Sequence, residues 1–155
     1  MIVALNDACK KFLPPFSTYP EVQMEMQRMV LIIDDSPTDI ELTTIALEAT
    51  ERKISVCSAS DGKSALAMLR NGLGMPALIL LDLKMPGMGG IEVLREIRDD
   101  ARLKEIPVVM VTSSALESDR ADAIAAGADY YIQKPLDLGK FSKDLECIVH
   151  HWLPI

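Results

Sequence analysis

The chain has 155 residues, of which 49% are hydrophobic and 25% charged, a composition typical of one globular domain rather than a disordered chain or coiled coil. The net charge of −7 disfavours binding to nucleic acid or to an anionic membrane, because both need a basic protein surface. No apolar stretch approaches the roughly 18 residues of a membrane-spanning helix, and residues 2–5 are too short for a signal peptide. We therefore expect a cytoplasmic protein.

Residues 1–28 differ in character from the rest of the chain. Pro14, Pro15 and Pro20 interrupt this segment, and its apolar residues follow no sustained period. We expect residues 1–28 to form a loosely ordered N-terminal extension and residues 29–155 to form one folded domain.

From residue 29 onward, short apolar runs alternate with segments of helical spacing. The runs lie at residues 29–33, 54–59, 77–81, 107–111 and 130–132, and the helical segments at residues 36–47, 64–70, 91–97, 118–126 and 138–152. A continuous apolar run is typical of a strand buried on both faces, and regular alternation with helices is typical of a parallel sheet. The sequence therefore predicts an α/β fold, with a doubly wound, five-stranded parallel sheet covered by helices on both faces.

The first of these helices has a clear start. Ser36 can cap it, Pro37 suits the first helical position, and Asp39 completes the spacing of a capping box. Ile40, Thr44 and Leu47 then recur at helical spacing, and we expect them to face the sheet.

Residues that can carry chemistry follow the ends of four of the five predicted strands. Asp34 and Asp35 follow the first strand, Asp82 the third, Thr112 the fourth and Lys134 the fifth. In an open parallel sheet, ligands bind beyond the carboxyl ends of the strands, where these side chains meet. Three adjacent carboxylates repel one another unless a cation lies between them, and a set of oxygen ligands favours Mg²⁺.

This combination of groups suits the transfer of a phosphoryl group. A carboxylate next to Mg²⁺ and a lysine can act as a nucleophile toward phosphorus. The cation and the lysine would stabilise negative charge on the transferring oxygens, and the threonine hydroxyl would donate a hydrogen bond to one of them.

The order and placement of these motifs resemble the receiver domains of two-component response regulators, which are CheY-like and flavodoxin-like in fold. The resemblance covers residues 29–152 and rests on VLIIDDS at 30–36, LLDLKMPGMGG at 80–90, Thr112 and Lys134-Pro135. It implies that Asp82 accepts the phosphoryl group. It also implies that Asp35, Asp82 and the backbone carbonyl of Lys84 bind Mg²⁺ directly, while Asp34 acts through a metal-bound water.

The resemblance implies further roles near the fourth and fifth strands. Lys134 and Thr112 would contact the phosphoryl group, and the rotamer of Tyr131 would follow the position of Thr112 as part of a switch. The bond between Lys134 and Pro135 would be cis. Each residue also has a simpler interpretation: Asp34 and Asp35 can favour a helix start, Lys134 can be a solvated lysine, and Tyr131 can be a half-buried strand tyrosine.

The expected function is that of a single-domain response regulator in a phosphorelay. A sensor histidine kinase or histidine phosphotransfer protein would donate to Asp82, and the aspartyl phosphate would alter a protein-binding face formed by residues 118–126, 130–132 and 138–152. The chain ends directly after the last receiver helix, so it is expected to act through its own surface. We expect no enzyme activity beyond self-catalysed phosphoryl acceptance and slow autodephosphorylation.

Three other classes of protein share part of this pattern. A haloacid-dehalogenase-type phosphatase needs a second aspartate two residues after the first, where this chain has Lys84. A flavodoxin has a hydroxyl- and glycine-rich first loop, where this chain has Asp34 and Asp35. A receiver-like interaction module that works without phosphorylation remains the alternative, since such a pocket can persist unused.

Overall fold

The computed structural model describes residues 2–4, 28–50, 52–71, 74–134 and 137–153. In this part of the chain six parallel strands form one sheet in the order β1-β3-β2-β4-β5-β6. The strands are β1 (Ile2–Ala4), β2 (Met29–Ile33), β3 (Ile54–Ala59), β4 (Leu78–Leu81), β5 (Val108–Thr112) and β6 (Tyr130–Gln133). The helices are α3 (Pro37–Glu48), α4 (Gly62–Arg70), α5 (Gly90–Asp99), α6 (Glu117–Ala125) and α7 (Leu138–Trp152).

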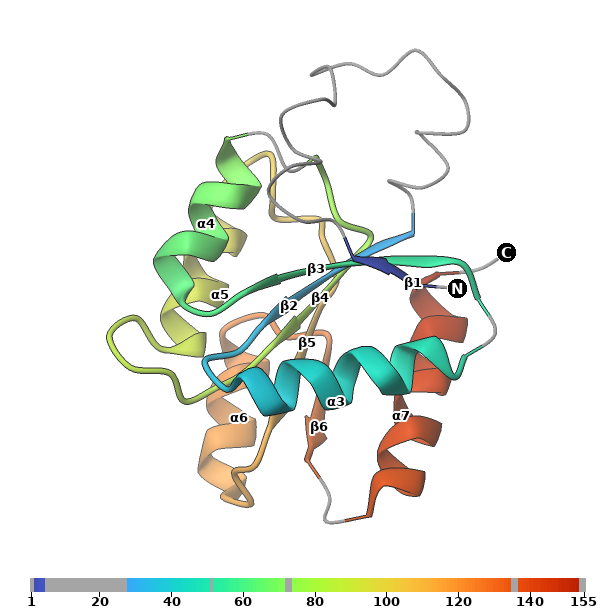
Figure 1. Ribbon diagram of the computed structural model, residues 1–155. Helices are drawn as coiled ribbons and strands as arrows, with labels where there is room; N and C mark the ends of the chain where they lie inside the picture. Colours follow the sequence, from blue (N-terminus) through green and yellow to red (C-terminus); the bar gives the residue numbers. More distant parts are fainter. Residues whose placement is uncertain (1, 5–27, 51, 72–73, 135–136, 154–155) are drawn as a thin grey trace.

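Helices cover both faces of this sheet, which confirms the predicted doubly wound α/β fold (Figure 1). Side chains that alternate along β2 enter two separate cores. Leu31 and Ile33 join the core beneath α4, α5 and α6, whereas Val30 and Ile32 join the core beneath α3 and α7. A strand buried on both faces needs apolar residues at every position, and this explains the continuous apolar runs of the sequence.

The sixth strand, β1, was not predicted. It lies at the edge of the sheet and pairs in parallel with β3, from Ile2 opposite Ile54 to Ala4 opposite Val56. Three residues are too few to show a period in the sequence, so pattern analysis had no signal for this strand. Residues 5–27 lie outside the described part of the chain, and the domain boundary near residue 28 stays a prediction.

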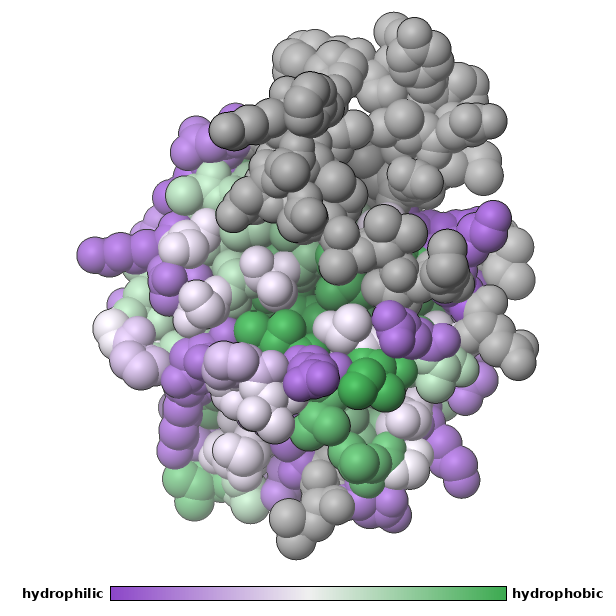
Figure 2. Space-filling model, in the orientation of Figure 1, coloured by the Kyte–Doolittle hydropathy of each residue, from purple (hydrophilic) through white to green (hydrophobic). Residues whose placement is uncertain are grey.

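The start of α3 matches the sequence, but its buried stripe differs. The Ser36 side chain caps the helix by accepting a hydrogen bond from the backbone N–H of Asp39. The buried residues are Thr43, Ala46 and Leu47, whereas Ile40 and Thr44 are half-buried. Of the predicted stripe, Leu47 is buried and Ile40 packs against the core beneath α3 and α7, whereas Thr43 is buried in place of Thr44. α3 crosses the front of Figure 2, where hydrophilic and hydrophobic residues are mixed.

The last two helices span nearly their predicted ranges, although Leu138, the first residue of α7, is 56% exposed. α7 buries Phe141, Leu145 and Ile148, and Trp152 is half-buried at its end. Gly127 follows α6 with φ of +106°, the left-handed conformation that glycine commonly adopts just after a helix ends. Within the described residues, no helix is long and apolar enough to cross a lipid bilayer.

Candidate functional site

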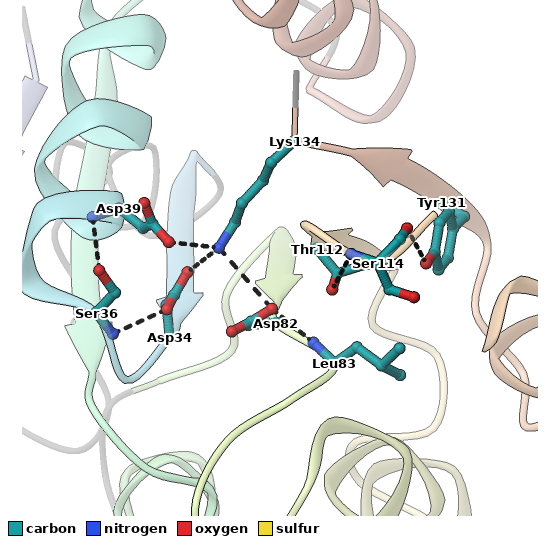
Figure 3. Close-up of polar contacts among 9 residues, drawn as sticks. All are labelled: Asp34, Ser36, Asp39, Asp82, Leu83, Thr112, Ser114, Tyr131 and Lys134. Atoms are coloured by element: carbon teal, nitrogen blue, oxygen red, sulfur yellow. Dashed lines mark hydrogen bonds and ion pairs between the residues drawn. The ribbon is translucent and has the colours of Figure 1, made fainter. Parts of the chain in front are cut away.

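The polar residues predicted at the strand ends meet at one edge of the sheet. β4 lies between β2 and β5, so Asp82 has Asp34 on one side and Thr112 on the other (Figure 3). Asp34, Asp35 and Asp82 each offer a carboxylate oxygen, and these oxygens lie within 4.8 Å of one another. Lys134, at the end of β6, extends its side chain into the space between Asp34 and Asp82.

Asp82 is buried beside this cluster, with 8% of the residue exposed. Its Oδ1 accepts a hydrogen bond from the backbone N–H of Leu83 at 2.9 Å. Burial raises the pKa of the Asp82 carboxyl to about 6; the Lys134 charge opposes this rise, while the charges of Asp34 and Asp35 add to it. A buried carboxylate that is only partly compensated by Lys134 and lies next to two other carboxylates is costly to ionise, so the site favours a cation next to Asp82.

The loop after β4 fixes the position of Asp82. The Asp82 backbone N–H donates to the carbonyl of Ile33, and the Gly90 N–H donates to the carbonyl of Leu83, both at 2.8 Å. A Cβ atom at Gly90 would lie 2.2 Å from the Asp82 carbonyl oxygen. Glycine is therefore required where α5 begins, because the helix starts directly against the backbone of Asp82.

Lys134 is held by two hydrogen-bonded ion pairs. Its Nζ donates to Oδ2 of Asp34 at 2.7 Å and to Oδ2 of Asp39 at 2.9 Å, and it lies 3.8 Å from Oδ1 of Asp82. Burial lowers the pKa of the Lys134 ammonium, but the bonds to Asp34 and Asp39 outweigh this effect, so its pKa lies above the ordinary value. The lysine is therefore charged at neutral pH.

Asp39 is the residue of this site that the sequence analysis missed. It was expected to close a capping box, in which its carboxylate would accept from the backbone N–H of Ser36. Instead Oδ1 of Asp34 accepts from Ser36 N–H at 2.9 Å, and the Asp39 carboxylate turns to Lys134 (Figure 3). The spacing from Ser36 gave a sufficient local reason for an aspartate, so nothing in the sequence indicated its distant partner.

Thr112, Ser114 and Tyr131 lie on the other side of Asp82 (Figure 3). Thr112 is 1% exposed, and its hydroxyl oxygen accepts a hydrogen bond from Ser114 N–H at 3.3 Å. The Tyr131 hydroxyl donates to the carbonyl oxygen of Ser114 at 3.1 Å. One loop after β5 thus contacts both predicted switch residues, although their switching role stays a prediction.

Lys84 also lies where the sequence placed it, two residues after Asp82. Its side chain is 67% exposed, and its Nζ lies 3.6 Å from Oδ2 of Asp119 at the start of α6. The Ser114 hydroxyl donates to the same carboxylate oxygen. The predicted cis bond between Lys134 and Pro135 lies outside the described residues.

The donor set of this site suits a hard divalent cation. Three carboxylates supply oxygen ligands only, which Mg²⁺ and Mn²⁺ prefer over the nitrogen and sulfur ligands typical of zinc sites. Because Asp82 and Asp34 are buried and Asp35 is exposed, a bound cation would be reachable from solvent on the side of Asp35.

Sequence comparisons find relatives among bacterial response regulators. The chain is 32% identical to Protein PilH of Pseudomonas aeruginosa over 120 residues, which cover 77% of this chain and 96% of PilH. It is 38% identical to Response regulator PleD of Caulobacter vibrioides over 112 residues, 72% of this chain, but it spans only 24% of the length of PleD. It is 30% identical to the polar-differentiation response regulator DivK of Brucella anthropi over 121 residues, which cover 78% of this chain and 95% of DivK.

Solved structures agree with these relatives. The phosphorylated cyanobacterial phytochrome response regulator RcpA has a TM-score of 0.76 and 33% identity, covering 82% of this chain and 94% of RcpA. The Mn²⁺-bound form of response regulator Rcp1 has a TM-score of 0.72 and 32% identity, covering 82% and 95%. The model of the response regulator receiver domain matches residues 30–146, which is most of the chain, and this protein therefore belongs to the response regulator receiver family.

Proposed function

We propose that this receiver accepts a phosphoryl group on Asp82 from a histidine kinase or a histidine phosphotransfer protein. The observation that carries the proposal is the cluster at the sheet edge. There, carboxylate oxygens of Asp34, Asp35 and Asp82 lie within 4.8 Å of one another, and Oδ1 of Asp82 lies 3.8 Å from Nζ of Lys134. Such a cluster provides a nucleophile, ligands for a cation and a positive charge in one place.

In the proposed step, Asp82 is the nucleophile, and Lys134 and Thr112 stabilise the transferred group. An Asp82 carboxylate oxygen attacks the phosphorus of phosphohistidine, the P–N bond breaks, and the imidazole leaves with its electron pair and takes up a proton from water. Lys134 turns an N–H toward an oxygen of the transferred group, and the Thr112 hydroxyl donates to another. The aspartyl phosphate hydrolyses slowly without a dedicated active-site base, so the protein acts as an acceptor and not as a classical enzyme.

A Mg²⁺ ion would bind to Asp35, Asp82 and the backbone carbonyl of Lys84, with Asp34 acting through a water. When bound, the ion neutralises charge on the transferring phosphoryl oxygens. The residues of this chain set its place: Asp34 already accepts from Lys134 and Ser36, which suits an outer role better than direct ligation. The Mn²⁺-bound neighbour Rcp1 makes Mn²⁺ a second cation to test.

We propose that the transfer takes place in the cytoplasm, and membership of the response regulator receiver family suggests a histidine kinase as the phosphoryl donor. Three of the similar solved structures are response regulators of phytochromes: RcpA, RtBRR and AtBRR, at 33%, 38% and 38% identity. A phytochrome-type histidine kinase is therefore the first donor to test.

The proposed output face consists of α6, β6 and α7. Leu116, Ile124 and Tyr130 expose 57%, 48% and 52% of their surface here, more than such side chains usually do. Tyr131 of β6 is joined through Ser114 to the loop that follows Thr112. A shift of Thr112 toward the phosphoryl group would therefore alter this loop and the face beside it, which would bind a protein target in a phosphorylation-dependent way.

The first experiment measures the mass of the intact protein after incubation with acetyl phosphate, with and without Mg²⁺. Wild type is compared with Asp82→Asn and with Asp122→Asn, a control at an exposed position on α6. We expect one phosphoryl adduct that needs Mg²⁺, forms in the control and is absent from Asp82→Asn. No adduct from either acetyl phosphate or a phosphohistidine donor would refute the proposal and favour the phosphorylation-independent module.

A further inference from the structure

Asp39 makes a contact that the proposed phosphoryl transfer does not require. Its carboxylate lies on the far side of Lys134 from Asp82, at the start of α3, and accepts a hydrogen bond from Nζ at 2.9 Å. The lysine ammonium has three N–H donors. Two of them are used by Asp34 and Asp39, which leaves one directed at the space next to Asp82.

The distance from Lys134 to Asp82 shows that the third donor of the ammonium does not bond to the Asp82 carboxylate. At 3.8 Å, Nζ and Oδ1 of Asp82 are an ion pair but are too far apart for a hydrogen bond, which needs about 2.7–3.2 Å. Lys134 is 16% exposed, so its ammonium has little water and depends on nearby carboxylates. The carboxylates of Asp34 and Asp39 bind the ammonium directly and keep it beyond hydrogen-bond distance of Asp82.

We propose that Asp39 is a positioning residue that holds Lys134 away from Asp82 before phosphorylation. The two bonds, to Asp34 and Asp39, fix Nζ at a distance that leaves the acceptor carboxylate uncapped and leaves room for a phosphoryl oxygen. The third N–H is then ready to meet that oxygen. This inference rests on the proposed role of Asp82 as the acceptor.

Removal of the Asp39 charge has a predictable consequence. With Asp34 still bound, the nearest further carboxylate oxygen recorded for Lys134 is that of Asp82, so a movement of about 1 Å completes a direct hydrogen bond. Water can enter from the small cavity lined by Asp39 and Lys134, but a buried carboxylate is a stronger acceptor for an ammonium than water is. The lysine would then neutralise the nucleophile and compete with a cation for it.

The sequence position of Asp39 allows this role without cost to the helix. Its backbone N–H is bonded to the Ser36 hydroxyl, and this cap does not use the Asp39 side chain. An asparagine at position 39 therefore keeps the cap and the shape of the side chain, while it replaces the carboxylate by an amide oxygen, which is a weaker acceptor for the Lys134 ammonium than the Asp82 carboxylate is. Glu41, exposed and two residues further along α3, provides a matched control in which the same charge is removed from the same helix.

The test compares Asp39→Asn, Asp39→Glu and Glu41→Gln in the full chain, each alone and with Lys134→Gln. In a crystal structure of Asp39→Asn we expect the distance between Nζ of Lys134 and the nearest Asp82 oxygen to fall to about 3 Å. The dissociation constant for Mg²⁺ should rise about fivefold, since the cation must displace one additional hydrogen bond. The rate of phosphorylation by acetyl phosphate should fall with it.

Controls separate positioning from a simple effect of charge. Asp39→Glu should restore most of the Mg²⁺ affinity, and Glu41→Gln should leave both properties close to wild type. In the Lys134→Gln background, Asp39→Asn should have little further effect, because Asp39 acts through the lysine. An unchanged 3.8 Å distance in the Asp39→Asn crystal structure, or an equal loss of Mg²⁺ affinity without Lys134, would overturn the inference. A wild type that forms no adduct would instead refute the proposed function, and the crystallographic distance would still decide the position of Lys134.

Discussion

Replacing Asp82 by asparagine should stabilise the fold, and the gain should grow with pH. Burial raises the pKa of the Asp82 carboxyl from 3.8 in the unfolded chain to about 6 in the folded protein. Above pH 6 the folded state must hold a buried charge that the unfolded state keeps in water, so this carboxylate lowers the free energy of unfolding. Well below pH 3.8 the group is protonated in both states and the penalty disappears. Asparagine has no such charge at any pH.

The size of the effect follows from the shift. Each pKa unit corresponds to about 1.4 kcal/mol, so the rise to about 6 gives a limit of about 3 kcal/mol at pH 8. At pH 5 the folded carboxyl is largely protonated, and the expected gain is about half as large. The asparagine side-chain oxygen can keep the hydrogen bond from Leu83 N–H, which limits other losses.

The assay is urea unfolding of wild type and Asp82→Asn at pH 5, 6, 7 and 8, with EDTA to remove divalent cations. Asp122→Asn, on the exposed side of α6, serves as the control and should show no comparable trend. Adding Mg²⁺ should narrow the difference in the free energy of unfolding between Asp82→Asn and wild type, because a ligand that binds only the folded wild type stabilises it. A gain that is absent, or that is the same at pH 5 and pH 8, would refute the account of a buried, poorly compensated charge.

Three further predictions follow from single contacts. Gly90→Ala should slow phosphorylation and destabilise the fold, because its Cβ would meet the Asp82 carbonyl at 2.2 Å, while Gly89→Ala, with its nearest contact at 3.7 Å, should change little in either assay. Arg98→Ala should lower the free energy of unfolding in urea by about 2 kcal/mol, because Arg98 donates to the carbonyls of Gly127, Lys104 and Ile106 and to Asp129; Arg95→Ala on the same helix is the control. The phosphorylated protein should lose its adduct more slowly than a Lys84→Asn, Ser114→Glu variant, because Lys84 and Ser114 engage Asp119 and supply no amide or carboxylate to orient water; faster loss in the wild type, followed by mass, would contradict this.

The part of the site that was predictable from the sequence is the part that the strands determine. Asp34, Asp82 and Thr112 follow buried strands whose apolar runs are unambiguous, and parallel pairing brings such strand ends together whatever the helices do. Helix orientation was harder to predict. Thr43 rather than Thr44 faces the sheet, because packing against the sheet decides among neighbouring positions and a threonine gives no clear preference.

Asp39 shows a different limit of sequence analysis. A carboxylate in the first turn of a helix is favourable by itself, since it lies near the positive end of the helix dipole. That local reason fits Asp39 fully, and its contact with Lys134, 95 residues away in the sequence, adds a second function without changing the first. A residue whose local role is already satisfied gives no indication of a distant partner in the sequence. The contact becomes visible only when the fold brings Lys134 next to the start of α3.

The charges of the site explain why Lys134 is the residue to follow. Asp34, Asp39 and Asp82 pair with the ammonium of Lys134, and Asp35 lies beside Asp34 and Asp82, so these five groups carry a net charge of −3 when all are ionised. A bound divalent cation would reduce that charge to −1, and a phosphoryl group on Asp82 would then make it more negative again. The added repulsion must be relieved by a positive group next to the phosphoryl oxygens, and Lys134 has one N–H donor that neither Asp34 nor Asp39 uses. We therefore expect that the strength of the hold on Lys134, which Asp39 sets, determines how readily this receiver accepts and keeps its phosphoryl group.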